Sequence, residues 1–306
     1  MTTYKSTILF LAFVVNSILS FSQQVPHYTQ YLYNMQIVNP AAVGLRSDLN
    51  ISLLSRSQWV GVDGAPSTQT LSLNARSVKG LGFGFTVIND KIGLTKSTNT
   101  NIDLSYTIIT NEKSRLALGL KGGANFFSND LASGITPDQE IYQSTTGTYP
   151  NIGFGAMYYN DWYFVGLSIP YLLKSSEFTI ETSEVTELTN SLNYFFTGGV
   201  KFYINDDLEF KPTTLIKYTT NLPLSIDINA NALYMKKYEA GLSYRYNDSL
   251  SIMLAYVLSE KIRFGYVYEH KFTDFGNNLS THEILINFDL NLKRQGRWLQ
   301  HNSCYF

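Results

Sequence analysis

The fold is decided by the stretch Leu224-Ser225-Ile226-Asp227-Ile228-Asn229-Ala230-Asn231-Ala232, in which every second residue is apolar and the others are Ser, Asp or Asn. A period of two places one residue type on each face of a β-strand. The same alternation recurs at residues 102–108, 238–246, 262–269 and 284–292. The chain is therefore predicted to be all-β, with strands that have one apolar and one polar face.

About fourteen segments of this kind follow one another along the chain. Most are about 9–11 residues or longer, the length that lets a tilted strand cross the hydrocarbon core of a membrane. An even number of strands suits a barrel of the bacterial outer membrane. We therefore predict a transmembrane up-and-down antiparallel β-barrel over residues 48–293, with strands at 48–56, 67–76, 80–89, 98–110, 113–127, 150–160, 161–169, 193–205, 207–219, 223–235, 237–247, 249–258, 260–270 and 281–293.

The connections between these segments are sorted by length. All even-to-odd connections are short, and odd-to-even connections are short only around 221 and 247–248. Outer-membrane barrels have short turns on the periplasmic side and longer loops outside. A soluble β-sandwich has no reason to sort its loops in this way, and its strands are usually only about 5–6 residues long. The predicted long loops are 57–66, 90–97, 128–149, 170–192 and 271–280.

Residues 1–22 have the composition of a secretory signal peptide. Lys5 precedes an apolar run at 8–15, and Ser20 and Ser22 supply small residues before the expected cleavage site. We predict Gln23 as the new N-terminus; a buried N-terminal helix is the alternative. Residues 23–47 are predicted to form a periplasmic plug or short helix, and residues 294–306 a periplasmic tail.

Composition excludes several classes of function. The formal net charge of −1 gives no basic field that would attract nucleic acid. The single Cys304 excludes an internal disulfide and a thiolate zinc cluster.

Within the predicted strand 207–219, Pro212 predicts a bulge or a shortened strand, because proline donates no ladder hydrogen bond. The charged residues predicted to face the lumen are Asp103, Lys121, Lys201, Glu209, Lys217, Asp227, Glu239, Arg245, Arg263, Glu269 and Asp289.

Motifs for catalysis are missing from the sequence. There is no Gly-x-Ser-x-Gly elbow, phosphate-binding loop or dinucleotide fingerprint, and His282-Glu283 lacks the second histidine of a zinc helix. We therefore expect no enzymatic activity, catalytic residue, cofactor or metal.

Tyrosines near strand ends are expected either to form interfacial aromatic girdles or to pack within the sheet, namely Tyr106, Tyr158, Tyr218, Tyr244 and Tyr268.

Two early stretches contain more than strand residues. In residues 26–35, Tyr28, Tyr31 and Leu32 fall on one face of a helical turn, which indicates a short helix in the barrel mouth. Residues 56–69 lie at the first long loop and combine an aromatic residue with a rigid turn. Packing into the barrel mouth is one interpretation, and partner binding is the other. The candidate partner-binding residues are His27, Tyr28, Gln30, Tyr31, Arg56, Gln58, Trp59 and Pro66.

Motifs of a known family begin in these stretches. They are Pro26-His27-Tyr28-Thr29-Gln30-Tyr31, Asn34-Met35, Asn39-Pro40-Ala41, Arg56-x-Gln58-Trp59 and Gly64-Ala65-Pro66-x-Thr68-Gln69. They continue at 168–170, 211–217, 241–245, 265–266 and 282–284, and the chain ends in Cys304-Tyr305-Phe306. Together they resemble the PorP/SprF family of type IX secretion system outer-membrane proteins, whose members usually end in Arg-Tyr-Phe.

The resemblance implies a location in the outer membrane and contact with its lipid. The implied partners are a type IX secreted adhesin with a C-terminal sorting domain and periplasmic components of the same system. The chain would serve export or surface anchoring of the adhesin in gliding bacteria, through β-addition or loop contacts. A transporter of small apolar molecules similar to fatty-acid channels is the alternative, since those barrels also have about fourteen strands and a plug. An outer-membrane enzyme is the third hypothesis.

Overall fold

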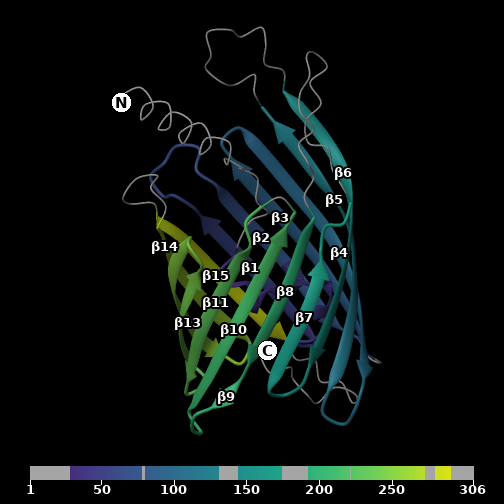
Figure 1. Ribbon diagram of the computed structural model, residues 1–306, viewed down its shortest axis with the longest axis vertical. Coiled ribbons are helices and arrows are strands. Elements are labelled where there is room, and N and C mark those ends of the chain that lie inside the picture. Colours follow the sequence, from purple (N-terminus) through teal and green to yellow (C-terminus); the bar gives the residue numbers. More distant parts are fainter. Residues whose placement is uncertain are drawn as a thin grey trace, which may run out of the picture.

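The computed structural model describes residues 28–77, 80–130, 144–173, 192–220, 222–272 and 280–290. The predicted signal peptide, His27 and the predicted C-terminal tail lie outside these ranges. The described residues form a continuous sheet (Figure 1). Its strands are β1 (Leu49–Ser57), β2 (Ser67–Arg76), β3 (Leu81–Ile92), β4 (Thr95–Ile109), β5 (Arg115–Asn129), β6 (Thr145–Tyr159), β7 (Tyr163–Ile169), β8 (Asn193–Val200), β9 (Phe202–Tyr203), β10 (Leu208–Thr219), β11 (Ser225–Tyr234), β12 (Tyr238–Arg245), β13 (Ser249–Ser259), β14 (Ile262–Lys271) and β15 (Ser280–Leu290).

The sheet closes on itself. Each strand pairs antiparallel with its neighbours in the chain, and β15 returns to pair with β1 from Leu49↔Leu290 to Ser57↔His282. β8 and β9 flank Lys201 and both pair with β10, so they are one interrupted strand. The predicted fourteen-stranded up-and-down barrel is therefore confirmed. Closure matters because it leaves no open sheet edge within a membrane.

Pro212 does not interrupt its own strand, contrary to the prediction. β10 continues through it and pairs Pro212 with Ala230 of β11. The interruption falls at Lys201 in the adjacent strand, between the Gly199↔Thr213 and Phe202↔Phe210 pairs. Because proline has no N–H to donate to the ladder, the irregularity appears in the strand that lies next to Pro212.

The sheet has its polar face inside and its apolar face outside, the reverse of a soluble protein. On β11, Asp227, Asn229 and Asn231 are buried in the lumen, while Ile228 between them is 57% exposed on the outside. Among the charged residues predicted to face the lumen, Lys201, Glu209, Arg263 and Asp289 are half-buried, and the others are buried: Asp103, Lys121, Lys217, Asp227, Glu239, Arg245 and Glu269. An apolar exterior around a polar interior is the pattern of a transmembrane barrel.

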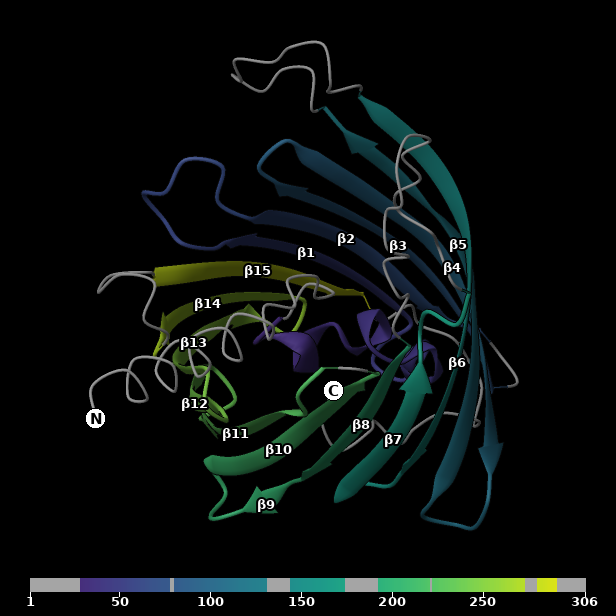
Figure 2. The same cartoon turned by 45° about the horizontal axis from the view of Figure 1, so that its top comes forward.

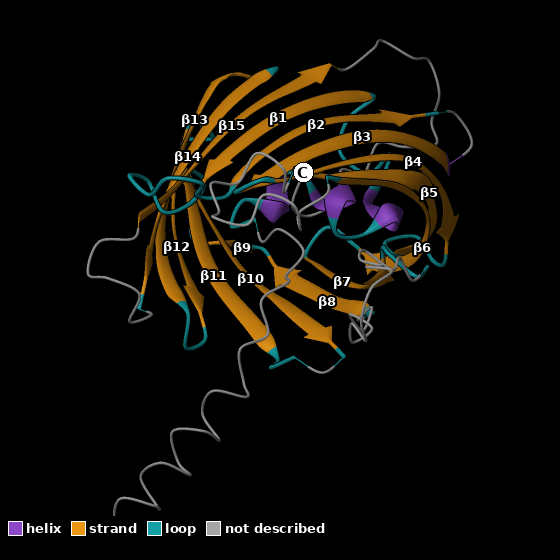
Figure 3. Cartoon of the chain, turned by 90° about the horizontal axis from the view of Figure 1, so that it is seen from above, coloured by secondary structure: helices purple, strands orange, loops and turns teal. Residues whose placement is uncertain are grey.

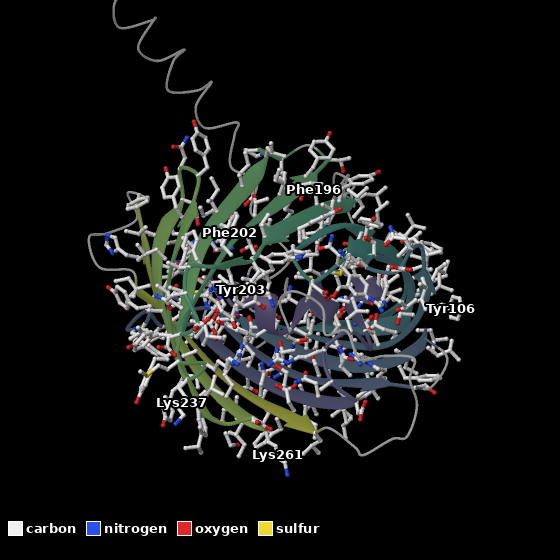
Figure 4. The ribbon with its side chains drawn as sticks, turned by 90° about the horizontal axis from the view of Figure 1, so that it is seen from below. Tyr106, Phe196, Phe202, Tyr203, Lys237 and Lys261 are labelled. Carbon is white, nitrogen blue, oxygen red and sulfur yellow. The ribbon has the colours of Figure 1, made fainter. Side chains whose placement is uncertain are left out.

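Aromatic side chains gather on the outside near both rims. Tyr106, Tyr218, Tyr244 and Tyr268 are exposed and Tyr158 is half-exposed, as a girdle requires. Figure 4 shows Tyr106 and Lys261 on the outside of the ring. At the end of the barrel with the short turns, hereafter the short-turn end, rings pair as Tyr158–Tyr163 and Tyr238–Tyr256; at the opposite end, the long-loop end, they pair as Tyr194–Tyr218 and Tyr244–Phe272.

The barrel wall is uneven in height. β4, β5 and β6 each have 15 residues, whereas β7 has 7 and β8 has 8. The sheet of β3–β6, hereafter the tall wall, therefore rises beyond the other strands at the long-loop end (Figures 1 and 2). No helix among the described residues is long and apolar enough to span a membrane.

The tall wall corrects two predicted loops. Residues 90–97 are not a long loop, because β3 and β4 continue to the Ile92↔Thr95 pair and are joined by Gly93 and Leu94 alone. Gly93 has a φ of 57°, which suits the first central position of a two-residue hairpin turn. Likewise β6 starts at Thr145 instead of residue 150, inside the predicted loop 128–149. These extensions are rich in Thr, Ser and Asn and lack the apolar alternation that the prediction relied on.

Candidate functional site

Residues 28–48, hereafter the plug, occupy the lumen. They form three short 3₁₀ turns, η1 (Tyr31–Tyr33), η2 (Met35–Ile37) and η3 (Pro40–Ala42), instead of the single short helix that was expected. Figure 3 shows these turns within the ring of strands. Residues 28–45 are all buried. The chain thus fills the lumen with its own polypeptide before it enters β1.

Carboxylates of two adjacent strands hold the start of the plug. Glu283 of β15 accepts hydrogen bonds from the backbone N–H groups of Thr29 at 2.9 Å and Gln30 at 3.1 Å. The Thr29 hydroxyl donates to Glu269 of β14 at 3.2 Å. Arg56 of β1 donates to Glu283 and, at 2.9 Å, to Glu269. Arg56 and Glu283 therefore fix the plug at the seam where β15 meets β1.

The ionic network continues across the lumen wall. Arg245 of β12 binds Asp227 of β11 through two hydrogen bonds of 2.8 and 3.0 Å and lies 3.5 Å from Glu269. Arg245 also reaches Asp248 in the next turn at 3.3 Å. Partial burial acts to raise the pKa of Asp248, but the Lys271 ammonium and the Arg245 guanidinium outweigh it and hold that pKa below its ordinary value. The network links β1, β11, β12, β14 and β15.

Amide and hydroxyl groups bind the middle of the plug. The Asn229 side chain donates to the Tyr31 hydroxyl at 2.8 Å. Asn34 donates to the Ser72 hydroxyl at 2.8 Å, and Gln36 donates to the Thr86 hydroxyl at 2.7 Å. A buried polar group costs free energy unless it has a partner. The polar lumen wall supplies those partners, which is why a polar segment can be buried here.

The last residues of the plug lie near the short-turn end. Arg46 donates to both carboxylate oxygens of Asp289, with the Nε–Oδ1 and Nη2–Oδ2 distances each 2.8 Å. Arg76 donates to the carbonyl oxygens of Gly44 at 2.7 Å and Leu45 at 2.9 Å. Glu283 lies opposite Arg56 and Asp289 lies opposite Asn50 in the β1–β15 register. The plug therefore runs from the long-loop half of the lumen, at Thr29, to the short-turn end, at Arg46.

Glycines in the wall let the backbone of η3 approach. A Cβ atom on Gly119 of β5 would collide with the backbone at Pro40 and Ala41, and one on Gly155 of β6 would collide with the Asn39 side chain. Asn39 caps η3 by accepting from the Ala41 N–H at 2.9 Å and donates to the Ala156 carbonyl oxygen at 3.1 Å. The wall and the plug are thus shaped to each other on this side too.

Replacing Gly119 with leucine is expected to lower the free energy of unfolding by about 1–3 kcal/mol, the usual cost of overpacking a close-packed interior. The matched control is Gly122→Leu on the same strand, because a Cβ atom there meets no atom within 4 Å. Urea unfolding of the reconstituted barrels, followed by electrophoretic mobility without boiling, measures both. Equal stability of the two variants would contradict a close contact at Gly119.

The structure separates the eight candidate partner-binding residues into groups. Tyr28, Gln30, Tyr31 and Arg56 are buried in the lumen as part of the plug or its anchor. In this arrangement a partner outside the barrel cannot touch them, because plug and wall cover them. The structure therefore shows a packing role for this group, and partner binding by these residues stays a prediction. His27 lies outside the described residues.

The other three candidates belong to the first loop, residues 58–66. The Gln58 N–H donates to the Pro66 carbonyl oxygen at 2.9 Å, which closes the loop at its base. Pro66 is buried, whereas Gln58 and Trp59 are half-buried. Trp59 has a φ of 47°, and the following Val60 N–H donates to the Ser280 carbonyl oxygen at 3.1 Å. The loop is therefore folded against β15, and a partner-binding role for Gln58 and Trp59 stays a prediction.

Sequence reasoning missed the main anchors of the plug. Glu283 was considered only as part of a His-Glu pair, and Arg46 was not considered at all. The alternation on β15 could have found Glu283, because it has the same parity as Asp289, which was predicted to face the lumen. Its partner Arg56 has the parity of Asn50 and Ser52 on β1 and is 1% exposed.

A closed antiparallel barrel with an apolar exterior, aromatic rims and a polar, filled lumen defines a class, the β-barrel proteins of the outer membrane. In that setting the long-loop end faces the cell exterior and the short-turn end faces the periplasm. Residues 20–288 match the family described as type IX secretion system membrane protein PorP/SprF. The chain belongs to this family.

Comparisons with other proteins and solved structures concern the barrel fold alone. No curated protein matches the chain. The Acinetobacter baumannii outer membrane protein Omp33 is 9% identical with a TM-score of 0.46, over 81% of this chain and 100% of that one. The CymD monoaromatic hydrocarbon channel is 12% identical with a TM-score of 0.46 (87% and 94% covered), and a Pseudomonas aeruginosa FadL homologue is 10% identical with a TM-score of 0.42 (88% and 95%). Such values carry no inference about cargo.

Proposed function

We propose that this outer-membrane component of the type IX secretion system acts by recognition and holds a secreted adhesin at the cell surface. The adhesin would present its C-terminal sorting domain to the long-loop end, and periplasmic components of the system would contact the short-turn end. The chain has no catalytic step in this proposal. The carrying observation is that the chain's own plug fills the lumen, which leaves the rim of the barrel as the working surface.

The plug also disfavours the alternative of a transporter for small apolar molecules. The lumen wall presents many Arg, Glu, Asp, Asn and Thr side chains, several of which are bonded to the plug, and its apolar residues such as Leu54, Phe164 and Leu285 are packed in one cluster with the plug. An apolar solute in the lumen would have to displace these hydrogen bonds without replacing them, which costs free energy for each buried group left unpaired. Liposome uptake of a labelled fatty acid tests the alternative, and we expect no uptake above that of empty vesicles.

Shortening the outer connections is expected to release the adhesin. Residues 131–143 and 174–191 lie between strands whose ends face the exterior, so both can be replaced by short turns without touching a strand. Adhesin on intact cells, measured by surface immunolabelling, should fall while adhesin in the medium rises. The matched control replaces residues 273–279 in the same way. Normal surface retention in the variant that lacks both connections, with the barrel present and folded, would refute anchoring through this end.

A further inference from the structure

The tall wall ends in a strand edge on the β7 side. β5 and β6 pair over their whole length, from Arg115↔Tyr159 to Asn129↔Thr145. β6 and β7 pair only as far as Phe154↔Ile169, and beyond this the Leu172 N–H donates to the Ile152 carbonyl oxygen at 2.8 Å. Within the described part of the chain, no strand pairs with residues 145–150 of β6 on this side. We call residues 145–150 the β6 edge.

The direction of the backbone groups on the β6 edge follows from Ile152. Its carbonyl points toward the β7 side, and residues two positions apart in a strand point their N–H and C=O groups to the same side. The N–H and C=O groups of Thr146 and Thr148 and the carbonyl of Pro150 therefore face outward from the edge. Pro150 fits this assignment, since proline in a sheet is confined to positions whose missing N–H faces away from the ladder.

The β6 edge lies beyond the apolar band that meets the lipid. The highest outward-facing apolar residues on β4 and β6 are Ile102 and Ile152, which flank Gly122 in the same row. Above this row the outward positions on β4 and β6 are polar or proline: Thr100, Thr98 and Lys96 on β4, and Pro150, Thr148 and Thr146 on β6. On β5, between them, the exposed Phe126 lies in the row of Thr98 and Thr148, as an aromatic residue of the outer rim. The β6 edge therefore rises from above the main apolar band toward the exterior side of the membrane, where Figures 1 and 2 show β5 and β6 projecting.

The β6 edge carries no charged side chain that would protect it against pairing, and its Pro150 limits pairing only at the membrane-side end. Exposed edge strands are commonly blunted by charged side chains, especially lysine. Residues 144–149 read Ser-Thr-Thr-Gly-Thr-Tyr and carry no charge. Five aligned backbone groups, from Thr146 to Pro150 over a length of about 14 Å, can accept one additional strand.

We propose that the β6 edge receives an extended strand of the secreted surface protein, which joins the barrel sheet by backbone hydrogen bonds outside the membrane. This rests on the proposed function and names the surface that carries it. Recognition is by backbone geometry, so the partner segment needs an unpaired, uncharged strand more than a particular sequence. Pro150 and the Leu172–Ile152 hydrogen bond mark the membrane-side limit of the added strand.

The decisive variant is Thr146→Pro/Thr148→Pro. It removes both free N–H donors and leaves the ladder to β5 intact, because these two N–H groups face away from β5. We expect the affinity for the purified C-terminal sorting domain of the surface protein to fall about ten- to hundredfold, as each backbone hydrogen bond contributes up to about tenfold. Retention on cells should fall with it, while heat-modifiable mobility shows a folded barrel.

Two further variants complete the test. Thr146→Val/Thr148→Val changes the same side chains but keeps both N–H donors; loss of binding there would overturn strand addition in favour of side-chain recognition. Thr98→Val/Thr100→Val changes two threonines of β4 that lie level with Thr148 and Pro150, and reports a general effect on the tall wall. Unchanged binding by the double-proline variant would overturn the inference. Deletion of the whole chain separates the two claims, because normal retention in the deletion strain refutes the proposed function and the inference with it.

Amide hydrogen exchange tests the free state of the β6 edge. In the purified full-length barrel the amides of residues 146 and 148 should exchange fast, and the added sorting domain should slow them at least tenfold. Slow exchange in the barrel alone would mean that another part of this chain already pairs with the edge, and it would overturn the inference. Fast exchange that persists at saturating sorting domain would do the same.

Discussion

Replacing Arg56 with alanine is expected to lower the free energy of unfolding by about 3–5 kcal/mol, the usual cost of removing one partner from a buried ion pair. Arg56 is the guanidinium that both Glu269 and Glu283 bind, and Glu283 is 0% exposed. Without it, Glu283 would keep only the two N–H groups of the plug. Urea unfolding in lipid vesicles measures the difference.

Lys91→Ala is the matched control for Arg56→Ala. Lys91 is a basic residue of β3 that is exposed near the long-loop end. Its loss should change the free energy of unfolding by less than about 0.5 kcal/mol, as for most surface substitutions. If Arg56→Ala were as mild as this control, the carboxylates would not depend on Arg56 for their burial.

Deleting residues 28–42 is expected to turn a closed barrel into a channel. These residues include all three 3₁₀ turns, and they pack against the wall from Glu283 on one side to Gly119 on the other. Without them the polar wall would hydrate. Planar bilayer recordings should show stepwise ion currents that the intact protein does not give.

The deletion variant must first show heat-modifiable mobility, which establishes that its barrel has formed. A folded but electrically silent deletion variant would contradict the plug as the seal of the lumen. Currents from the intact protein of the same size as those from the variant would contradict it equally.

Strands were predictable where lipid covers one face and the polar interior the other. Residues 223–235 were predicted as a strand and the structure has Ser225–Tyr234; for 281–293 it has Ser280–Leu290. The lipid imposes a period of two that a single sequence reveals. At the top of the tall wall, residues such as Lys96 and Thr148 belong to no apolar alternation, so these residues were assigned to loops.

The plug was only partly predictable. The Asn39-Pro40 pair is a local signal for the start of a helical turn, because Asn caps and proline suits the first helical position. The anchors of the plug lie far away in the chain: the Thr29 N–H and Glu283 are 254 residues apart. Such contacts depend on closure of the barrel and leave no local pattern. For the same reason, Arg56 was interpreted as part of a partner-binding motif.

The central claim is a closed barrel in the outer membrane with its long-loop end toward the exterior. Single cysteines in a Cys304→Ser background test it with a membrane-impermeant maleimide on intact cells. Asp63→Cys lies in the first loop at the long-loop end and Glu112→Cys in a short turn, and both positions are exposed. We predict that Asp63→Cys is labelled on intact cells and Glu112→Cys only after the outer membrane is permeabilised. Labelling of Glu112→Cys alone on intact cells, or equal labelling of both, would contradict the account.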